Sequence, residues 1–353
     1  MVKYSPEPAQ PGPQAGKIGV LLCNLGTPAA ATAPALRDYL HQFLSDPRVI
    51  ELPAAIWKPI LHGIVLRRRP EQSAKKYESV WLPGGSPLAV WSEKQRVLLR
   101  GYLGQRGLDV QVGLAMRYGE PAIAAQLGQL KAAGCDRILV LPLYPQYAAA
   151  TVGSVLDDVA DWIKTTRVVP ELRFVQHFHD HEGYLKALEQ TVLAHWQTHG
   201  RPDRLLMSFH GLPQRMIDRG DPYQKQCAAT AQRLAARLAL PQDAWTLAFQ
   251  SRFGRAKWIG PSTQDVLKQL GRAKVARVHV ICPGFVSDCL ETLEEINIEG
   301  RALFQSAGGG ELQYIPCLND HPMFINALAD LVGRHVGGWL DAAADDRKAP
   351  QGL

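Results

Sequence analysis

Short runs of apolar residues, separated by segments with helical periodicity, predict buried β-strands. In one intervening segment, Cys227, Ala231, Leu234 and Leu238 recur on one face of a helix. Strands that alternate with helices are typical of a parallel α/β sheet, because a parallel connection needs a crossover segment. The runs are KIGVLLCNLGTP (17–28), RILVLPLYPQY (137–147), RLLMSFHGLP (204–213) and RVHVICPGFVSD (277–288).

Two short motifs recur in the same order in both parts of the chain. NLGTP (24–28) resembles FHGLP (209–213), and MRYGEP (116–121) resembles SRFGRA (251–256). The distance from Gly26 to Arg117 is 91 positions, but the distance from Gly211 to Arg252 is 41, so the first half carries about 50 extra residues near 31–90. We therefore expect two similar α/β halves that face each other across a cleft lined by loops at the strand carboxyl ends. His210 then corresponds to Leu25.

This organisation predicts the domain boundaries. The proline-rich segment 1–16 has no apolar core, which argues against a signal peptide, and we expect a disordered tail there. We expect an N-terminal α/β domain over 17–176, with the insert near 31–90, and a C-terminal α/β domain over 177–340. Residues 341–353 are predicted to form a second tail.

The insert has an apolar character that allows two interpretations. Its helical patterns collect apolar side chains on one face and end in three consecutive arginines, and both core packing and an exposed apolar lip fit this pattern. A lip would grip a large flat ligand or touch a membrane, with the arginines toward anionic groups. The residues are Leu36, Tyr39, Leu40, Phe43, Leu44, Ile56, Trp57, Ile60, Leu61, Ile64 and Val65, followed by Arg67, Arg68 and Arg69.

Composition narrows the class of protein. The chain has 353 residues, of which 46% are hydrophobic and 20% charged, as in an ordinary globular protein with a sizeable core. A net charge of +6 is no argument for nucleic-acid binding, and no apolar stretch reaches the ~18 residues of a transmembrane helix. The six cysteines are scattered without a CxxC pair, which favours buried, reduced thiols in a cytoplasmic protein.

The third apolar run ends on a histidine, and the fourth leads into a row of acids. A strand that stops at His210 places an imidazole at the carboxyl edge of the predicted sheet. We expect a helix from Ser287 or Asp288 to Gly300, on which Asp288, Glu291, Glu295 and Glu299 share a face. Like charges at i, i+4 each cost roughly 0.2–0.5 kcal/mol. The row is therefore either a solvated acidic face or a path that passes cations or protons into the cleft.

His210 and Glu291 both follow strands of the second half, so both are expected at the same crevice. A lone strand-end histidine is more often structural, but the nearby carboxylates favour a functional one. One imidazole and one carboxylate leave coordination positions open, which suits transient metal binding.

A second group of histidines offers a competing metal site. His177, His179 and His181 alternate in HFHDHEGY (177–184), and this spacing allows zinc binding from one face of a strand. The segment precedes a helical pattern and is better interpreted as a surface crossing between the halves. Glycine-rich dinucleotide loops, P-loops, H-E-x-x-H and nucleophile elbows are absent from the sequence.

Taken in order, the motifs resemble those of the ferrochelatase family in its proteobacterial form, from Lys17 to about Leu340. That resemblance implies two Rossmann-like domains, each a parallel sheet flanked by helices, and insertion of Fe2+ into protoporphyrin IX to form protohaem with release of two protons. The motifs are LLCNLGTP, GGSPL, MRYGEP, LPLYPQYAAATVGS, SFHGLP, RGDPY, FQSRFG, WIGPST and GFVSDCLETLEEINIE.

The resemblance also assigns roles to residues by position. His210 and Glu291 match the catalytic metal-site pair, and Glu295 and Glu299, with Asp288 beside them, match an acidic path. Cys289 stands where some members have a histidine, and Ala149 where some have a cysteine. With no cysteine after Leu340, an iron–sulfur cluster is not expected. The positions that match substrate-binding residues of the cleft or lip are Leu25, Tyr77, Ser86, Arg117, Tyr118, Trp258 and Phe285.

Fe2+ and protoporphyrin IX are therefore the expected substrates, with no permanently bound cofactor and no nucleic-acid partner. The expected location is the cytoplasm, with the apolar lip in transient contact with the surface of the inner membrane. Two alternatives remain open at this point. One is a cobalt or nickel chelatase for a more acidic tetrapyrrole. Binding the additional carboxylates of that substrate would require more arginines in the cleft. The other is a non-catalytic porphyrin carrier, which has no use for a cation path.

Overall fold

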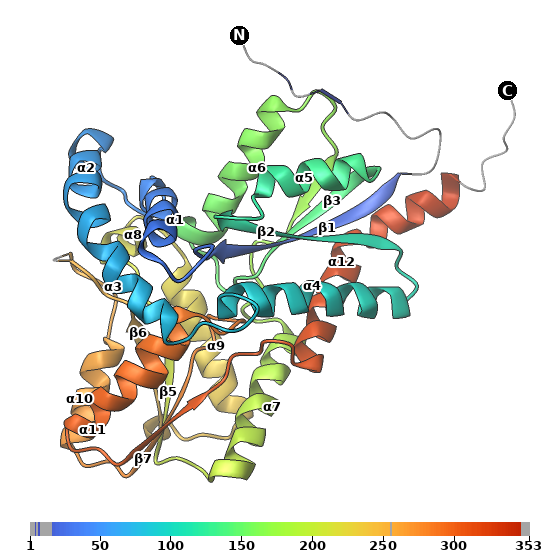
Figure 1. Ribbon diagram of the computed structural model, residues 1–353. Coiled ribbons are helices and arrows are strands. Elements are labelled where there is room, and N and C mark those ends of the chain that lie inside the picture. The colour runs from blue at the N-terminus through green and yellow to red at the C-terminus, as the bar shows by residue number, and fades with distance from the viewer. Residues whose placement is uncertain (1–3, 5, 8–15, 255, 347–353) are drawn as a thin grey trace, which may run out of the picture.

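Two separate parallel sheets organise the molecule, as the computed structural model shows (Figure 1). The structure describes residues 4, 6–7, 16–254 and 256–346. The sheets have the strand orders β2-β1-β3-β4 and β6-β5-β7-β8, which are the same order in the two halves. The strands are β1 (Lys17–Gly26), β2 (Val110–Tyr118), β3 (Cys135–Pro142), β4 (Glu171–Phe174), β5 (Arg204–His210), β6 (Trp245–Gln250), β7 (Arg277–Ile281) and β8 (Glu311–Ile315).

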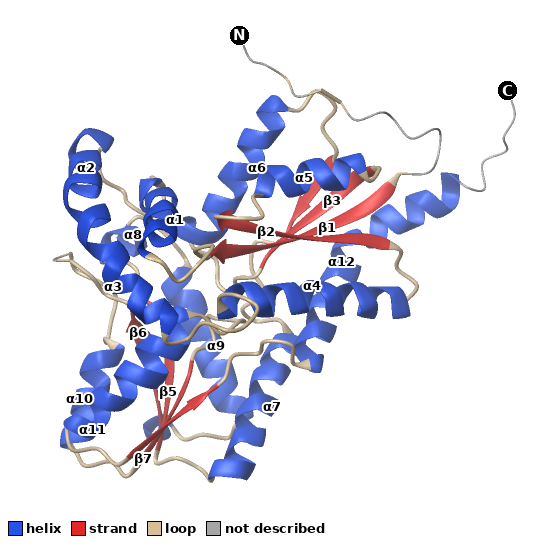
Figure 2. Ribbon diagram, viewed as in Figure 1, coloured by secondary structure: helices blue, strands red, loops and turns tan. Residues whose placement is uncertain are grey.

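Helices cover both faces of each sheet (Figure 2). The helices of the first half are α1 (Ala33–Ser45), α2 (Ala54–Ile60), the π-helix η1 (Leu61–Val65), α3 (Leu66–Glu78), α4 (Pro87–Gln105), α5 (Ile123–Ala132), the π-helix η2 (Ala149–Gly153) and α6 (Ser154–Thr165). Those of the second half are α7 (Glu182–His199), α8 (Gln214–Asp218), α9 (Tyr223–Arg237), the 3-10 helix η3 (Gln242–Ala244), α10 (Thr263–Arg272), the π-helix η4 (Glu291–Gly300), α11 (Arg301–Ser306) and α12 (Pro322–Asp346).

The central strand β1 shows how its sequence builds two cores. Its side chains alternate between the two faces of the sheet. Leu21 and Cys23 pack with residues of α5 and α6, and Val20 and Leu22 pack with residues of α4 and α12. Because both faces are covered, the strand is apolar throughout rather than alternating, as expected for a parallel sheet.

The two halves end their second strands in the same way, which supports the predicted duplication. The Met116 amide in β2 donates to the Pro121 carbonyl over 2.7 Å, and the Phe249 amide in β6 donates to the Pro261 carbonyl over 2.9 Å. The four strands predicted from apolar runs are confirmed as β1, β3, β5 and β7. The sequence analysis did not predict β2, β4, β6 and β8, which lie beside them.

Several details differ from the predicted organisation. Most of the expected N-terminal tail lies outside the described residues, but the Glu7 carboxylate accepts hydrogen bonds from the backbone amides of Arg167 and Val168 and pairs with Lys131. Helix α12 runs to Asp346, through part of the expected C-terminal tail, and packs on α4 as well as α7. The boundary near 176 stays a prediction. None of the described helices is long and apolar enough to cross a membrane.

The insert is part core and part exposed surface, so each interpretation of its apolar residues holds for some of them. Its packed residues form one cluster with side chains from β1, β2 and the start of η4, which we call the lip cluster. The cluster consists of Leu36, Tyr39, Leu40, Leu44, Leu61, Leu66, Tyr77 and Tyr118, with Leu25, Phe43, Trp57, Val65 and Leu290 packed against them. On the outer side, Ile56, Ile60 and Ile64 are 58%, 37% and 55% exposed. These three isoleucines recur every four residues over α2 and η1 and form one exposed apolar stripe.

Candidate functional site

The imidazole of His210 lies at the carboxyl end of β5, as predicted. Its Nδ1 is 2.6 Å from the carbonyl oxygen of Gly211. Because a carbonyl oxygen only accepts, this contact requires the proton on Nδ1 and leaves the lone pair on Nε2. An imidazole oriented in this way can accept a proton or bind a metal ion through Nε2.

Aromatic residues surround His210. The Phe285 ring, in the loop after β7, has its centroid 6.4 Å from that of His210. The Trp258 ring packs on the turn that follows the histidine, so that a Cβ added at Gly211 would lie 3.1 Å from it. Glycine at 211 therefore lets the indole approach the strand end closely. Both aromatic positions assigned to the pocket are thus beside the predicted catalytic histidine.

Gln250 connects the histidine strand with the acidic helix. It pairs in register with His210 across β5 and β6, and it is almost fully buried. Its Nε2 donates to the Glu291 carbonyl over 2.7 Å, and its Oε1 accepts from the Ser208 hydroxyl over 2.7 Å. The buried amide therefore fixes the first residue of η4 relative to the end of the sheet. The sequence analysis did not single out Gln250, although the FQSRFG motif contains it.

Glu291 begins a π-helix rather than an α-helix. In the π-helix backbone, hydrogen bonds join residues five apart, so side chains at i and i+5 approach one another. The predicted end at Gly300 is wrong, because the chain continues directly into α11. Burial is the main cause of the raised pKa of Tyr39 and of Tyr77, and the negative charge of Glu291 raises both further. The Glu291 carboxylate is therefore close to the lip cluster.

Glu295 is tied to the turn after β6. Its carboxylate accepts from the Ser251 amide over 2.7 Å and from the Ser251 hydroxyl over 2.5 Å. Ser251 has φ +62°, an uncommon value for a residue with a side chain. Burial raises the pKa of Glu295, and the nearby Glu291 raises it further, whereas hydrogen bonds from Ser251 and the nearby His210 imidazole lower it. Glu295 is therefore electrostatically linked to both predicted metal-site residues.

A lysine of the insert holds the outer end of the acidic helix. The Lys76 Nζ, on α3, is 3.0 Å from Glu294 Oε2 and 2.6 Å from Glu299 Oε1. Glu294 and Glu299 are five positions apart, so the π-helix brings them to one side where a single ammonium reaches both. Partial burial acts to lower the pKa of Lys76, but the hydrogen bonds with Glu299 and Glu294 outweigh this effect and raise it. An analysis based on helical period 3.6 missed Glu294, which is buried, and its partner Lys76.

Asp288 does not belong with the outer carboxylates. It is buried, and its Oδ1 accepts from the Tyr314 hydroxyl over 2.5 Å while its Oδ2 accepts from the Asn319 amide over 2.6 Å. Thr292 Oγ1 also donates to Oδ1, over 3.1 Å. With both oxygens engaged in this way, the carboxylate fixes the loop before η4, and we leave it out of the proposed path.

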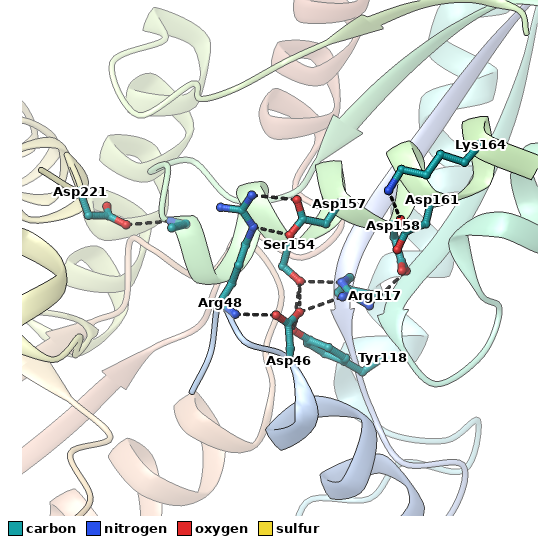
Figure 3. A network of polar contacts seen from close by, with 11 residues as sticks. Asp46, Arg48, Arg117, Tyr118, Ser154, Asp157, Asp158, Asp161, Lys164 and Asp221 are labelled. Carbon is teal, nitrogen blue, oxygen red and sulfur yellow. Dashed lines mark hydrogen bonds and ion pairs between the residues drawn. The ribbon is translucent and has the colours of Figure 1, made fainter. Parts of the chain in front are cut away.

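Arg117 and Tyr118 are held in an internal polar network (Figure 3). The Arg117 guanidinium pairs with Asp46 at 2.8 Å and with Asp158 at 3.1 Å. The Tyr118 hydroxyl and the Ser154 hydroxyl also donate to Asp46. The network joins the end of α1, the end of β2 and the start of α6, and so it fixes the base of the insert.

The remaining predicted substrate positions divide into two kinds. Leu25 and Tyr77 lie in or against the lip cluster together with Leu290, the residue before Glu291. Ser86 is buried and caps α4, where its hydroxyl accepts from the Ala89 amide over 3.2 Å. Leu25 and Tyr77 thus lie near the metal-site helix, whereas Ser86 has a structural partner on its own helix.

A hollow in the described surface lies away from these residues. It measures about 640 Å³ and lies between α4 and the edge strand β2, with Ala89, Leu114 and Met116 in its wall. None of the predicted site residues lines it. The predicted metal-site residues instead lie where β5, β6 and η4 meet.

Comparisons with known proteins agree with the fold and with the resemblance. A sequence model described as Ferrochelatase matches residues 17–336. The chain is 56% identical to the ferrochelatase of Aromatoleum aromaticum over 97% of its own length and 94% of that protein. It is 55% identical to the ferrochelatase of Methylibium petroleiphilum over 99% and 96%. The crystal structure of the sirohydrochlorin chelatase SirB from Bacillus subtilis subspecies spizizenii, in complex with cobalt, has a similar fold with TM-score 0.50 at 14% identity, covering 89% of this chain and 93% of that one.

Proposed function

This chain belongs to the ferrochelatase family of metal-inserting lyases, and on that basis we propose that it inserts Fe2+ into protoporphyrin IX, forming protohaem and releasing two protons. The observation that carries the proposal is the link between the strand end that carries His210 and the helix start that carries Glu291. His210 ends β5, Glu291 begins η4, and Gln250 links the two elements. One imidazole and one carboxylate with open coordination positions suit an ion that is delivered rather than retained.

Removal of the two pyrrole protons falls to His210 in this proposal. Its Nδ1 is engaged by the Gly211 carbonyl, so Nε2 offers the lone pair that accepts a proton from the ring. Glu291 holds the incoming ion or shares the proton. Phe285 and Trp258 place apolar surface around this point, as a flat tetrapyrrole requires.

The acidic helix is proposed to conduct ions and protons between the surface and His210. Glu295 is the inner member, since it is half-buried and electrostatically linked to His210. Glu299 is the exposed outer member, and the buried Glu294 shares Lys76 with it. A row of carboxylates raises the local concentration of cations at its open end. We infer that Lys76 moderates this effect, because it neutralises part of the row.

The lip is proposed to hold the macrocycle. Leu25 and Tyr77 provide apolar contacts beside Glu291, whereas Arg117, Tyr118 and Ser86 shape the lip through their own internal partners. No permanently bound cofactor is required by this scheme. We place the enzyme in the cytoplasm, with the exposed stripe of Ile56, Ile60 and Ile64 in transient contact with the inner membrane, where an apolar tetrapyrrole would be exchanged.

An anaerobic assay separates this function from that of a porphyrin carrier. Purified protein is mixed with an excess of protoporphyrin IX and Fe2+, and protohaem is followed by its absorption spectrum. A chelatase gives many product molecules per chain, and the rate rises with enzyme concentration. Binding of one porphyrin per chain without turnover would favour the carrier. A parallel assay with Co2+ or Ni2+ and a tetrapyrrole rich in carboxylates tests the remaining chelatase alternative.

A further inference from the structure

Three potential metal ligands meet on the segment that joins the two halves. This segment, 175–181, leads from β4, the last strand of the first sheet, to α7, the first helix of the second half. We propose that His177, His179 and Asp180 form a second metal site, separate from His210 and Glu291, which binds one divalent transition metal ion of the Zn2+ class.

The positions of the ligand atoms carry this proposal. One ligand atom from each of the three side chains lies within 4.8 Å of the other two, and no other group of three such side chains in the described part of the chain approaches as closely. Nδ1 of His179 is 4.0 Å from Oδ1 of Asp180. Bonds of about 2.0–2.2 Å at tetrahedral angles place ligand atoms roughly 3.4 Å apart, so small side-chain rotations that bring the three atoms closer together are needed for an ion to bind. His181, the third histidine of the alternating pattern, is outside this group.

The backbone of the segment is held in place before any ion binds. The Phe178 amide donates to the Pro145 carbonyl over 2.9 Å, and the Thr230 hydroxyl donates to the His179 carbonyl over 2.9 Å. Gln146 in turn donates to the Thr230 hydroxyl over 2.9 Å. The ligands therefore sit on a segment anchored to both halves, which lowers the ordering cost of binding an ion.

The chemistry of the three side chains also suits a metal ion. Nδ1 of His179 is buried and has no hydrogen-bond partner among the described residues, so an ion would satisfy it. Two imidazoles and one carboxylate, with a water in the fourth position, are a common set for tetrahedral Zn2+.

Another histidine group supplies the control. His195 and His199 on α7 have ring centroids 4.2 Å apart, and His279 lies 4.9 Å from His195. The first two rings are nearly parallel, at 21°, so their nitrogens do not converge as those around Asp180 do. Replacing this pair removes the same number of histidines without touching the proposed site.

Isothermal titration with Zn2+ tests the proposal in the full-length chain. The reference is His210→Ala, which removes the proposed cleft site, and it should bind one equivalent of Zn2+. Adding His177→Ala and His179→Ala should abolish that binding, whereas adding His195→Ala and His199→Ala should leave it. Asp180→Asn in the same background is the milder variant, and it should weaken binding at least about tenfold.

Circular dichroism checks that each variant is folded. If the double histidine variant is unfolded, Zn2+ binding by Asp180→Asn decides whether the site exists. The proposal is overturned if the His210→Ala protein binds no Zn2+. It is also overturned if binding is unchanged in the folded His177→Ala/His179→Ala variant or in Asp180→Asn. Because the readout is metal binding in a variant without the cleft histidine, failure here is independent of the proposed chelatase activity.

Discussion

The amide Nε2 of Gln250 donates to the carbonyl oxygen of Glu291 over 2.7 Å. Together with the hydrogen bonds from Ser251 to Glu295, this bond ties the start of η4 to the end of β6, which pairs in register with the end of β5. The Gln250 side chain is almost fully buried. The placement of the two proposed catalytic residues therefore depends on a residue that has no direct role in the chemistry.

Glu291 and Glu299 are predicted to affect different kinetic constants. Glu291 begins the helix that Gln250 links to the strand end carrying His210, so Glu291→Gln should lower kcat by about 10²–10⁴-fold, the usual range for loss of a general acid or base. Glu299 is exposed and pairs with Lys76, so Glu299→Gln should raise the KM for Fe2+ by about two- to fivefold, with kcat retained. Initial rates against Fe2+ concentration distinguish these effects, and equal rates at every iron level in both variants would refute the path.

Lys76 is predicted to oppose metal entry, because its positive charge neutralises part of the acidic row. Lys76→Met should lower the KM for Fe2+ by about two- to fivefold, opposite in sign to Glu299→Gln, and the difference should shrink at high salt. Lys75→Met removes the same charge one position earlier, at an exposed site, and is the matched control. If both lysine variants change the KM equally, the effect belongs to net charge and not to the bridge between Glu294 and Glu299.

Glu295 is predicted to make stability depend on pH. Since burial raises its pKa in the folded protein, its ionisation costs stability, and this cost appears as the pH rises through the raised pKa. The Tm of Glu295→Gln minus that of the parent protein should therefore increase as the pH rises from about 4.5, near the ordinary carboxyl pKa, towards neutrality. Thermal unfolding at a series of pH values measures this difference.

Glu182 provides a control of opposite sign. It is exposed, and its hydrogen bond with Arg237 lowers its pKa, so its contribution to stability is present above the ordinary carboxyl value and lost on acidification. The Tm of Glu182→Gln minus that of the parent protein should thus decrease as the pH rises. The same trend with pH in both variants would contradict this account of Glu295.

The cysteines are predicted to bind no iron–sulfur cluster. All six are free and buried. Burial raises the pKa of Cys282, Cys289 and Cys317, so these thiols stay protonated, whereas a cluster requires thiolates. Protein purified anaerobically should contain no acid-labile sulfide, and stoichiometric iron and sulfide would contradict the prediction.

The apolar pattern was sufficient for the central strands and for the position of His210, because a strand buried on both faces leaves a continuous apolar run. The apolar pattern did not predict β4 and β8, which have only four and five residues. It also did not predict β2 and β6, which lie outside the four apolar runs. The apolar face of α1 was predicted from a different pattern. In a helix that packs on one side, apolar residues recur every three or four positions.

The acidic helix shows where sequence periodicity fails. The stripe Glu291, Glu295 and Glu299 was visible at a spacing of four, but a π-helix also aligns residues five apart, and this aligns Glu294 with Glu299. No periodicity within one segment could identify Lys76, which comes from the insert, or separate Asp288, whose partners Tyr314 and Asn319 follow η4. Contacts between distant segments decided these roles.

His210 is the residue on which the proposed chemistry depends most, and His210→Ala tests it. The side chain is half-buried, and its Nδ1 bonds to the carbonyl of its own neighbour Gly211, so its loss should leave the fold intact. Two quantities are measured on the same folded protein under anaerobic conditions: protoporphyrin IX affinity, by fluorescence quenching, and the rate of protohaem formation at saturating Fe2+. We predict porphyrin binding within about threefold of the parent and a rate lowered by at least about 100-fold. Formation of protohaem at the parental rate by the folded variant would contradict the account.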